Sequence, residues 1–296
     1  MTATTINTVP PPSAFHGLSL LGLAALALAA LAAAPIASVW ANLFAGVTMH
    51  DFPGRRVFAW ALVLPLAVPA YVMAYTYTDL LQFVGPVQSG LRESFGWQKG
   101  DYWFPDVRTL GGAIAMFIFV LYPYVYLLAR TAFLERASGM LEVGRSLGLG
   151  AWGSFFRISL PLARPAVAAG ATLALMETLA DYGTVAYFAV QTFTTGIYRA
   201  WFSLGDRVAA AQLSASLLGF VVLVLLLERV SRGRARFHNT TGRNRPHPGR
   251  RLYGFRAAAA MLACLLPLLL GFLLPAGLLL KMALREGDAQ FGPRFA

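Results

Sequence analysis

Two acidic residues, Glu177 and Asp181, lie inside a long apolar stretch and are the residues of this chain best suited to contact a cation. Their spacing of four places both carboxylates on one face of a helix. A charged group in hydrocarbon is costly, so it faces a pore or a partner, or it lies near the membrane surface and bonds to a neighbouring helix. Carboxylate and phenolate oxygens are hard donors, and Tyr182 and Tyr187 follow closely. We expect these four residues to line a path for a hard cation, with a purely structural role as the alternative.

A second candidate segment runs from Leu141 to Pro161, between two apolar stretches. Its first part is expected to be a helix that ends at Gly148 and Gly150, because glycine adopts the left-handed capping conformation without steric cost. A short second helix follows, and Pro161 is expected to end the segment. That short helix carries three aromatic residues on one face, which suits either the membrane surface or a groove on another protein. They are Trp152, Phe155 and Phe156.

Composition identifies the class of protein. Of 296 residues, 57% are hydrophobic and 12% are charged, whereas a soluble domain carries about 25% charged residues. A polytopic membrane protein is therefore expected. The net charge of +11 is almost all arginine, which favours cytoplasmic loops and anionic lipid over nucleic acid as partners.

Several kinds of chemistry have no support in the sequence. One cysteine allows no disulfide within the chain, and the four histidines show no metal-ligand spacing, so no metal site is assigned. The chain has no nucleotide-binding loop of the Gly-x4-Gly-Lys-Ser/Thr type. No cofactor is expected here, and any ATP must be bound by a separate subunit.

The expected fold class is an all-α transmembrane bundle of about six spans, preceded by a disordered tail at 1–17. The second span should be kinked, since it contains Pro65 and Pro69. The expected spans are 18–47, 57–80, 108–130, 162–190, 207–227 and 257–280.

The distribution of arginine predicts the orientation. Residues 229–256 carry nine arginines and no acid, and the 141–161 segment is also rich in arginine, so both are expected to be cytoplasmic. The polar loops 81–107 and 191–206 would then be external. If 18–47 crosses the membrane once, the alternation of cytoplasmic and external loops places the N-terminus outside.

The 141–161 segment resembles the signature loop of ABC importer permeases, which reads Glu-Ala-Ala, three residues, Gly, nine residues, Ile-x-Leu-Pro. The register holds throughout, although Val143 and Gly144 occupy the two alanine positions. The resemblance implies that residues 131–163 form a coupling loop that docks its aromatic face into a cytoplasmic ATPase. The matching positions are Glu142, Gly148, Ile158, Leu160 and Pro161.

A narrower resemblance, over about residues 50–280, is to iron(III) ABC transporter permeases. Those proteins usually fuse two homologous halves in one chain. The resemblance implies that 18–256 is one permease transmembrane domain and that 257–296 holds the first span of a second half that is cut short. The stretches that carry it are 51–56, 122–126, 176–185 and 192–199.

The resemblance implies a multi-pass permease subunit of the inner membrane, not an enzyme. It would pass iron(III), delivered by a periplasmic binding protein, into the cytoplasm while separate subunits hydrolyse ATP. A second permease half or another copy of the chain would complete it. The alternatives are the same machinery with thiamine, a phosphonate or a polyamine as cargo, and a non-functional half-permease or scaffold. An intramembrane enzyme has the least support, because no span holds a His/acid or Ser/Lys grouping.

Overall fold

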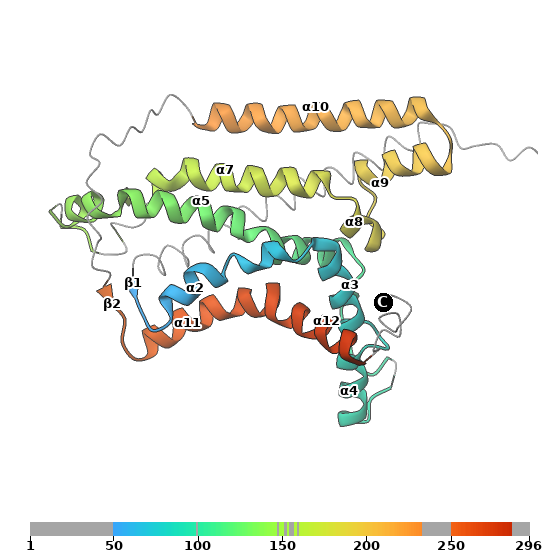
Figure 1. The fold of residues 1–296 in the computed structure, drawn as a ribbon, viewed down its shortest axis with the longest axis horizontal. Helices are drawn as coiled ribbons and strands as arrows, with labels where there is room; N and C mark the ends of the chain where they lie inside the picture. Colours follow the sequence, from blue (N-terminus) through green and yellow to red (C-terminus); the bar gives the residue numbers. More distant parts are fainter. Residues whose placement is uncertain are drawn as a thin grey trace, which may run out of the picture.

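The computed structural model describes residues 50–98, 100–146, 148–150, 153, 157–158, 160–232 and 250–285, with the backbone alone at 50, 135–145, 231–232, 250 and 285. The expected N-terminal tail and first span therefore lie outside the described residues. The described part is almost entirely helical, with a pair of two-residue strands. Figure 1 shows the long helices running roughly alongside one another, with the shorter α8 and α9 at one end of the bundle.

The centre of the bundle is a hairpin of two long helices, α5 (Leu110–Ser146) and α7 (Leu160–Ala180). Side chains from both helices pack together along it, in a cluster that includes Ala129, Phe133 and Ala163. The closest approach is at Gly170, where an added Cβ would lie 2.6 Å from the Cα of Val125. Only glycine allows the two backbones to come this close.

The second expected span is broken rather than kinked. It consists of α2 (Arg55–Ala61), η1 (Leu64–Ala67) and α3 (Ala70–Leu81), followed by α4 (Pro86–Phe95). The part before Val68 and the part after Pro69 meet at 89°. Val68 is extended and Pro69 precedes α3 with an extended backbone, because proline cannot continue a helix from the residues before it.

The loop expected at 81–107 contains the helix α4, which begins with Pro86 in its first turn. The loop expected at 191–206 contains α9 (Phe193–Tyr198) and the π-helical turn η3 (Arg199–Ser203). The fourth expected span is shorter than predicted: α7 ends at Ala180, and a separate short helix, α8 (Gly183–Tyr187), follows.

Helix α10 (Arg207–Arg232) packs against α7, α9 and η3. It begins where the fifth span was expected to begin. Only 6% of its most apolar window is buried within this chain, compared with 56% for α5. Most of α10 therefore presents an apolar surface to its surroundings.

The C-terminal part is one long, nearly continuous helix made of α11 (Phe255–Leu268), η4 (Leu269–Leu273) and α12 (Leu274–Arg285). It contacts α2, η1, α3 and α5, beneath α2 in Figure 1. An added Cβ at Gly271 would lie 2.8 Å from the carbonyl oxygen of Phe119. At its start, β2 (Arg250–Arg251) pairs in parallel with β1 (His50–Asp51).

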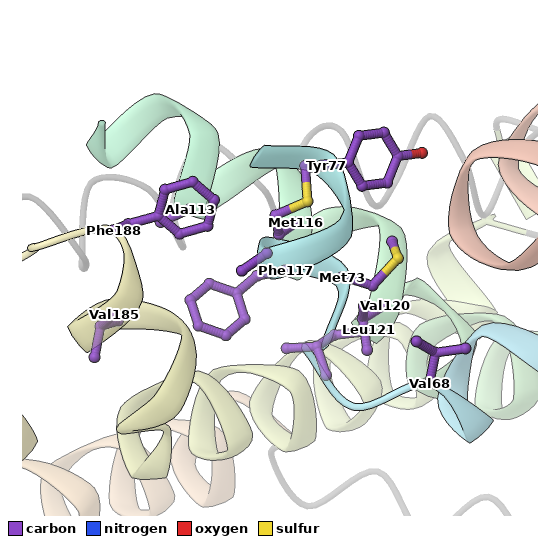
Figure 2. Close-up of a cluster of buried hydrophobic side chains, with 11 residues drawn as sticks. Val68, Met73, Tyr77, Ala113, Met116, Phe117, Val120, Leu121, Val185 and Phe188 are labelled. Carbon is purple, nitrogen blue, oxygen red and sulfur yellow. The ribbon is translucent and has the colours of Figure 1, made fainter. Parts of the chain in front are cut away.

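The main buried cluster lies where the broken second span meets α5 and α8, and Figure 2 shows its side chains. Met73 and Ala74 of α3 are fully buried there, together with Val185 and Phe188 from the region of α8. The cluster holds α3 across the end of the α5–α7 hairpin. The 89° turn after Ala67 is therefore fixed by packing and not by the prolines alone.

By length and composition, three described helices could cross a membrane, or four if the bent pair is one span. They are Leu110–Leu134, Arg207–Val230 and Phe255–Leu284, with the bent pair starting at Arg55. Helix α7 is not among them. Thus the multi-pass helical architecture is confirmed, whereas the count of about six spans is not.

Candidate functional site

The expected coupling segment is described in part. Helix α5 runs without a break from the third span through Glu142 to Ser146, so the span and the first coupling helix are one element. Gly148 has φ +72°, which is the left-handed corner predicted for it. Gly150 does not have this conformation, so of the two glycines only Gly148 is left-handed.

The second half of the coupling segment differs from the expectation at its end. Ile158 lies in a short π-helical turn, and α7 already begins at Leu160. Pro161 is therefore the second residue of α7 and not a terminator, in keeping with the preference of proline for the first turn of a helix. Trp152, Phe155 and Phe156, the expected docking face, lie outside the described residues.

The two candidate acids lie one helical turn apart at the end of α7. The amide of Asp181 donates to the carbonyl oxygen of Glu177 at 3.0 Å. The side chain of Glu177 is exposed. The Asp181 carboxylate accepts hydrogen bonds from the amides of Thr184 (2.9 Å) and Val185 (3.2 Å) and from the Thr184 hydroxyl (3.0 Å). Asp181 therefore holds the first turn of α8, while Glu177 is directed to the surroundings.

Asp181 is also joined to the next helix. The hydroxyl of Thr194 donates to the Asp181 carbonyl oxygen at 2.7 Å. Thr192 and Thr195 form a reciprocal capping box at the start of α9: each amide donates to the other's hydroxyl oxygen, at 2.8 and 3.4 Å. Two stretches that carry the narrower resemblance, 176–185 and 192–199, thus form one hydrogen-bonded corner.

The structure separates the two candidate tyrosines. The ring of Tyr182 stacks on Tyr198, with centroids 4.3 Å apart. Tyr187 lies toward the other side of α8, edge-on to Tyr75 at 6.2 Å, with the Arg108 guanidinium 5.4 Å from its centroid. Arg108 also donates to the Tyr187 carbonyl oxygen at 3.0 Å. Tyr182 therefore shares the surroundings of Asp181 and α9, whereas Tyr187 belongs to the contact with α3 and α5.

Sequence reasoning missed an aromatic row that continues from Tyr182. Tyr198 packs against Phe202 with centroids 4.5 Å apart. A largely apolar cavity of about 270 Å³ lies between this row and α10, lined by Ile197, Tyr198, Trp201, Phe202, Ala210, Ala211 and Ser214. The spacing of Tyr198 and Phe202, four residues apart, was the available signal.

The corner as described offers contacts rather than a chelating site. Within the described residues, no three His, Cys, Asp or Glu side chains gather in a way that could hold a metal ion. Glu177 and the Tyr182 hydroxyl can supply oxygen atoms to a passing ion, while Asp181 fixes the backbone between them. Tyr122 and Tyr126, in the 122–126 stretch, are buried within the bundle and offer no oxygen atoms at this corner.

A family model described as "Binding-protein-dependent transport system inner membrane component" matches residues 33–236. The chain belongs to this family. The match spans the coupling segment and the α7–α9 corner, and it ends before β2 and α11. Membership in this family makes the chain a multi-pass component of the inner membrane and a transport protein rather than an enzyme.

The chain is similar to curated permeases with different stated cargoes. It is 28% identical over 200 residues to the Fe(3+)-transport system permease protein FbpB 2 of Haemophilus influenzae, which is 67% of this chain and 35% of that protein. It is 32% identical over 181 residues to a probable molybdenum ABC transporter permease of Haloferax volcanii, covering 60% of this chain and 62% of that protein. It is 29% identical over 195 residues to the molybdenum permease ModB of Escherichia coli, covering 62% and 82%. It is also 31% identical over 136 residues to a probable sulfate transport system permease protein of Chlorokybus atmophyticus, covering 46% of this chain. The chain spans only 35% of the iron permease, 45% of this sulfate permease and 62% of the Haloferax permease.

Proposed function

We propose that this chain is a permease subunit of an ABC importer that passes iron(III) from a periplasmic binding protein into the cytoplasm. The observation that carries the importer proposal is the left-handed corner at Gly148. It follows one helix that runs unbroken from within the bundle to the coupling segment. A helix of this kind transmits movement of the coupling loop directly to its span.

The proposed coupling residues are those that match the signature loop. Cytoplasmic ATPase subunits would dock against Trp152, Phe155 and Phe156. The corner at Gly148 and the start of α7 at Leu160 and Pro161 would set the orientation of that face. ATP binding and hydrolysis belong to those subunits. The α5–α7 hairpin, in close contact at Gly170, would then move as one body.

A path across the membrane needs helices on all its sides, so we propose that a second permease half or another copy of this chain completes it. Helix α10 buries little of its apolar surface within this chain, which leaves that surface to lipid and to the second half. Whether residues 257–296 begin a second half stays a prediction. Helices α11 and α12 nevertheless pack against α2, α3 and α5 of the same bundle.

Iron(III) as cargo is supported by two exposed oxygen-bearing side chains five residues apart in the chain, Glu177 and Tyr182, and by the similarity to the iron permease. A tetrahedral oxyanion is the second candidate. It is favoured by the similarity to permeases named for molybdenum and sulfate. An oxyanion would be repelled by Glu177, whereas a cation would be attracted by it.

The cargo is tested by uptake of radiolabelled iron(III), molybdate and sulfate into cells with and without this gene. The proposal expects ATP-dependent iron uptake that is lost on deletion and restored by the plasmid-borne gene, with molybdate and sulfate uptake unchanged. Loss of molybdate or sulfate uptake with normal iron uptake would replace iron by that anion and leave the importer proposal intact. No change in the uptake of any of the three would exclude both the iron and the oxyanion candidates as cargo.

A further inference from the structure

Five arginines from four elements gather at the end of the bundle where β1 and β2 pair. Arg55 and Arg56 begin α2, Arg251 is in β2, Arg256 begins α11, and Arg130 lies in α5. We call these five residues the arginine patch. Its position at this end follows from the register, which sets Asp51 opposite Arg251.

Contacts across the elements hold the patch together. The Tyr126 hydroxyl donates to the Ala59 carbonyl oxygen at 3.1 Å, which joins α5 to α2. Arg55 precedes Ala59 by one turn of α2, and Arg130 follows Tyr126 by one turn of α5, so both arginines lie close to this bond. Beneath them, Phe52, Tyr126 and Ala257 belong to one buried cluster. The arginines are therefore placed by a packed core and not by independent surface loops.

The patch carries an excess of positive charge. Asp51 forms an ion pair with Arg55. Among the side chains that the structure describes at this end, five arginines against this one carboxylate leave a formal charge of +4. Arg56, Arg251 and Arg256 are exposed. Like charges gathered at one end of the bundle repel, so an anion is favoured there, and phosphate matches the forked geometry of arginine.

The patch lies at the depth of a membrane surface. The bent pair begins at Arg55, and the last candidate span begins at Phe255. Arg130 lies four residues before the end of the α5 span at Leu134, or about 6 Å along the helix. Large apolar side chains at the same end are strongly exposed: Val57 (70%), Trp60 (79%), Tyr253 (74%) and Phe255 (87%). Aromatic side chains of this kind are typical of the boundary between headgroups and hydrocarbon.

We propose that the arginine patch binds the phosphate headgroup of an anionic glycerophospholipid, with Trp60 and Phe255 against its glycerol and upper acyl region. Charge complementarity selects the anionic headgroup, and the exposed aromatic rim at span ends selects a lipid over a soluble phosphate. The lipid would fasten β1, α2 and α11 together at this end of the bundle. This inference depends neither on the cargo nor on the ATPase.

The test uses the full chain in phosphatidylcholine nanodiscs that contain increasing fractions of phosphatidylglycerol brominated on its acyl chains. Quenching of tryptophan fluorescence reports binding near Trp60, and a Trp60→Phe variant identifies its share of the signal. We expect saturable quenching in the wild type. In the double variant Arg251→Gln, Arg256→Gln, the apparent affinity should fall roughly 30-fold, at about 1 kcal/mol for each arginine.

The matched control removes the same two charges elsewhere. Arg207 and Arg229 are exposed on α10, which packs against α7, α9 and η3. The variant Arg207→Gln, Arg229→Gln should quench as the wild type does. The variant Arg251→Lys, Arg256→Lys keeps the charge and should keep most of the binding. It shows that substitution at these two positions does not by itself unfold the protein, so weaker binding by the glutamine variant reports the lost charge.

Two results would overturn the proposal. In the first, the Arg251, Arg256 glutamine variant is quenched with wild-type affinity; loss of a bound cytoplasmic subunit from the same variant would then make the patch a protein contact. In the second, inorganic phosphate at millimolar concentration displaces the lipid completely, which would assign the patch to a soluble anion.

Discussion

The hydroxyl of Thr194 donates a hydrogen bond of 2.7 Å to the carbonyl oxygen of Asp181, thirteen residues before it in the chain. The carboxylate of the same aspartate accepts from the amide of Thr184 at 2.9 Å. Asp181 thus joins the end of α7 to the starts of α8 and α9. The presence of Asp181 in an apolar stretch is partly explained by the backbone amides that donate hydrogen bonds to its carboxylate. Glu177, by contrast, is exposed.

Asp181→Ala should lower the stability of the chain. It removes three hydrogen bonds to a charged acceptor, at an expected cost of about 2–3 kcal/mol. Thermal unfolding of the purified protein in detergent measures this. Glu177→Ala, at an exposed position in the same helix, should change stability by less than about 0.5 kcal/mol. Equal loss in both variants would contradict the structural role of Asp181.

Glu177→Gln should reduce iron uptake without a loss of stability. The variant keeps the size of the side chain and removes the charge that attracts a cation. At a partly wet site such a contact is worth about 3 kcal/mol, so uptake should fall on the order of a hundredfold. The measurement is uptake normalised to the amount of protein in the membrane. Glu93→Gln, at an exposed site on α4, is the matched control; a wild-type rate for Glu177→Gln would exclude Glu177 from the path.

Gly170→Ala should loosen the α5–α7 hairpin. The new Cβ would meet the Cα of Val125 at 2.6 Å, and the backbone cannot give way without separating the helices. We expect a loss of about 1–3 kcal/mol in unfolding free energy. Gly219→Ala on α10 is the control, since its Cβ would meet nothing within 4 Å. That change should stabilise the helix by up to about 1 kcal/mol, and the same sign for both variants would contradict the packing at Gly170.

Labelling from outside the cell tests the orientation. With Cys264 replaced by alanine, a cysteine at Ser94 on α4 should react with an impermeant maleimide, and a cysteine at Val230 should react only after the membrane is opened. Both positions are exposed in the structure. The expectation follows from the arginine-rich segment after α10, which favours the cytoplasm. Labelling of Val230→Cys in intact cells with protection of Ser94→Cys would reverse the topology.

Several features could be predicted from the sequence because their causes are local. The left-handed backbone at Gly148 follows from glycine after a long helix. The start of α10 at Arg207 follows Gly205, which is also left-handed. In each case neighbouring residues fix the outcome.

Other features depend on contacts between distant parts of the chain. Pro65 and Pro69 indicated an interruption, but the 89° turn depends on packing of α3 against α5 and α8. The β1–β2 pairing joins residues 200 positions apart and has no local signal. The early end of α7 depends on Asp181 bonding forward to α8. By contrast, α4 had a local signal in Pro86, which a reading of the segment as a loop overlooked.

The most direct test of the account is ATP-dependent iron uptake by vesicles that hold this chain, its permease partner and the ATPase, with the binding protein added outside. The account predicts uptake by the wild type. For Gly148→Val, which strains the corner because its φ of +72° disfavours a branched side chain, it predicts wild-type amounts of protein in the membrane but uptake near background. Gly150→Val, two residues later and at a glycine without positive φ, should retain most uptake. Full iron uptake by Gly148→Val, or equal uptake when this chain is left out, would contradict the central claim that the chain couples ATP hydrolysis to transport.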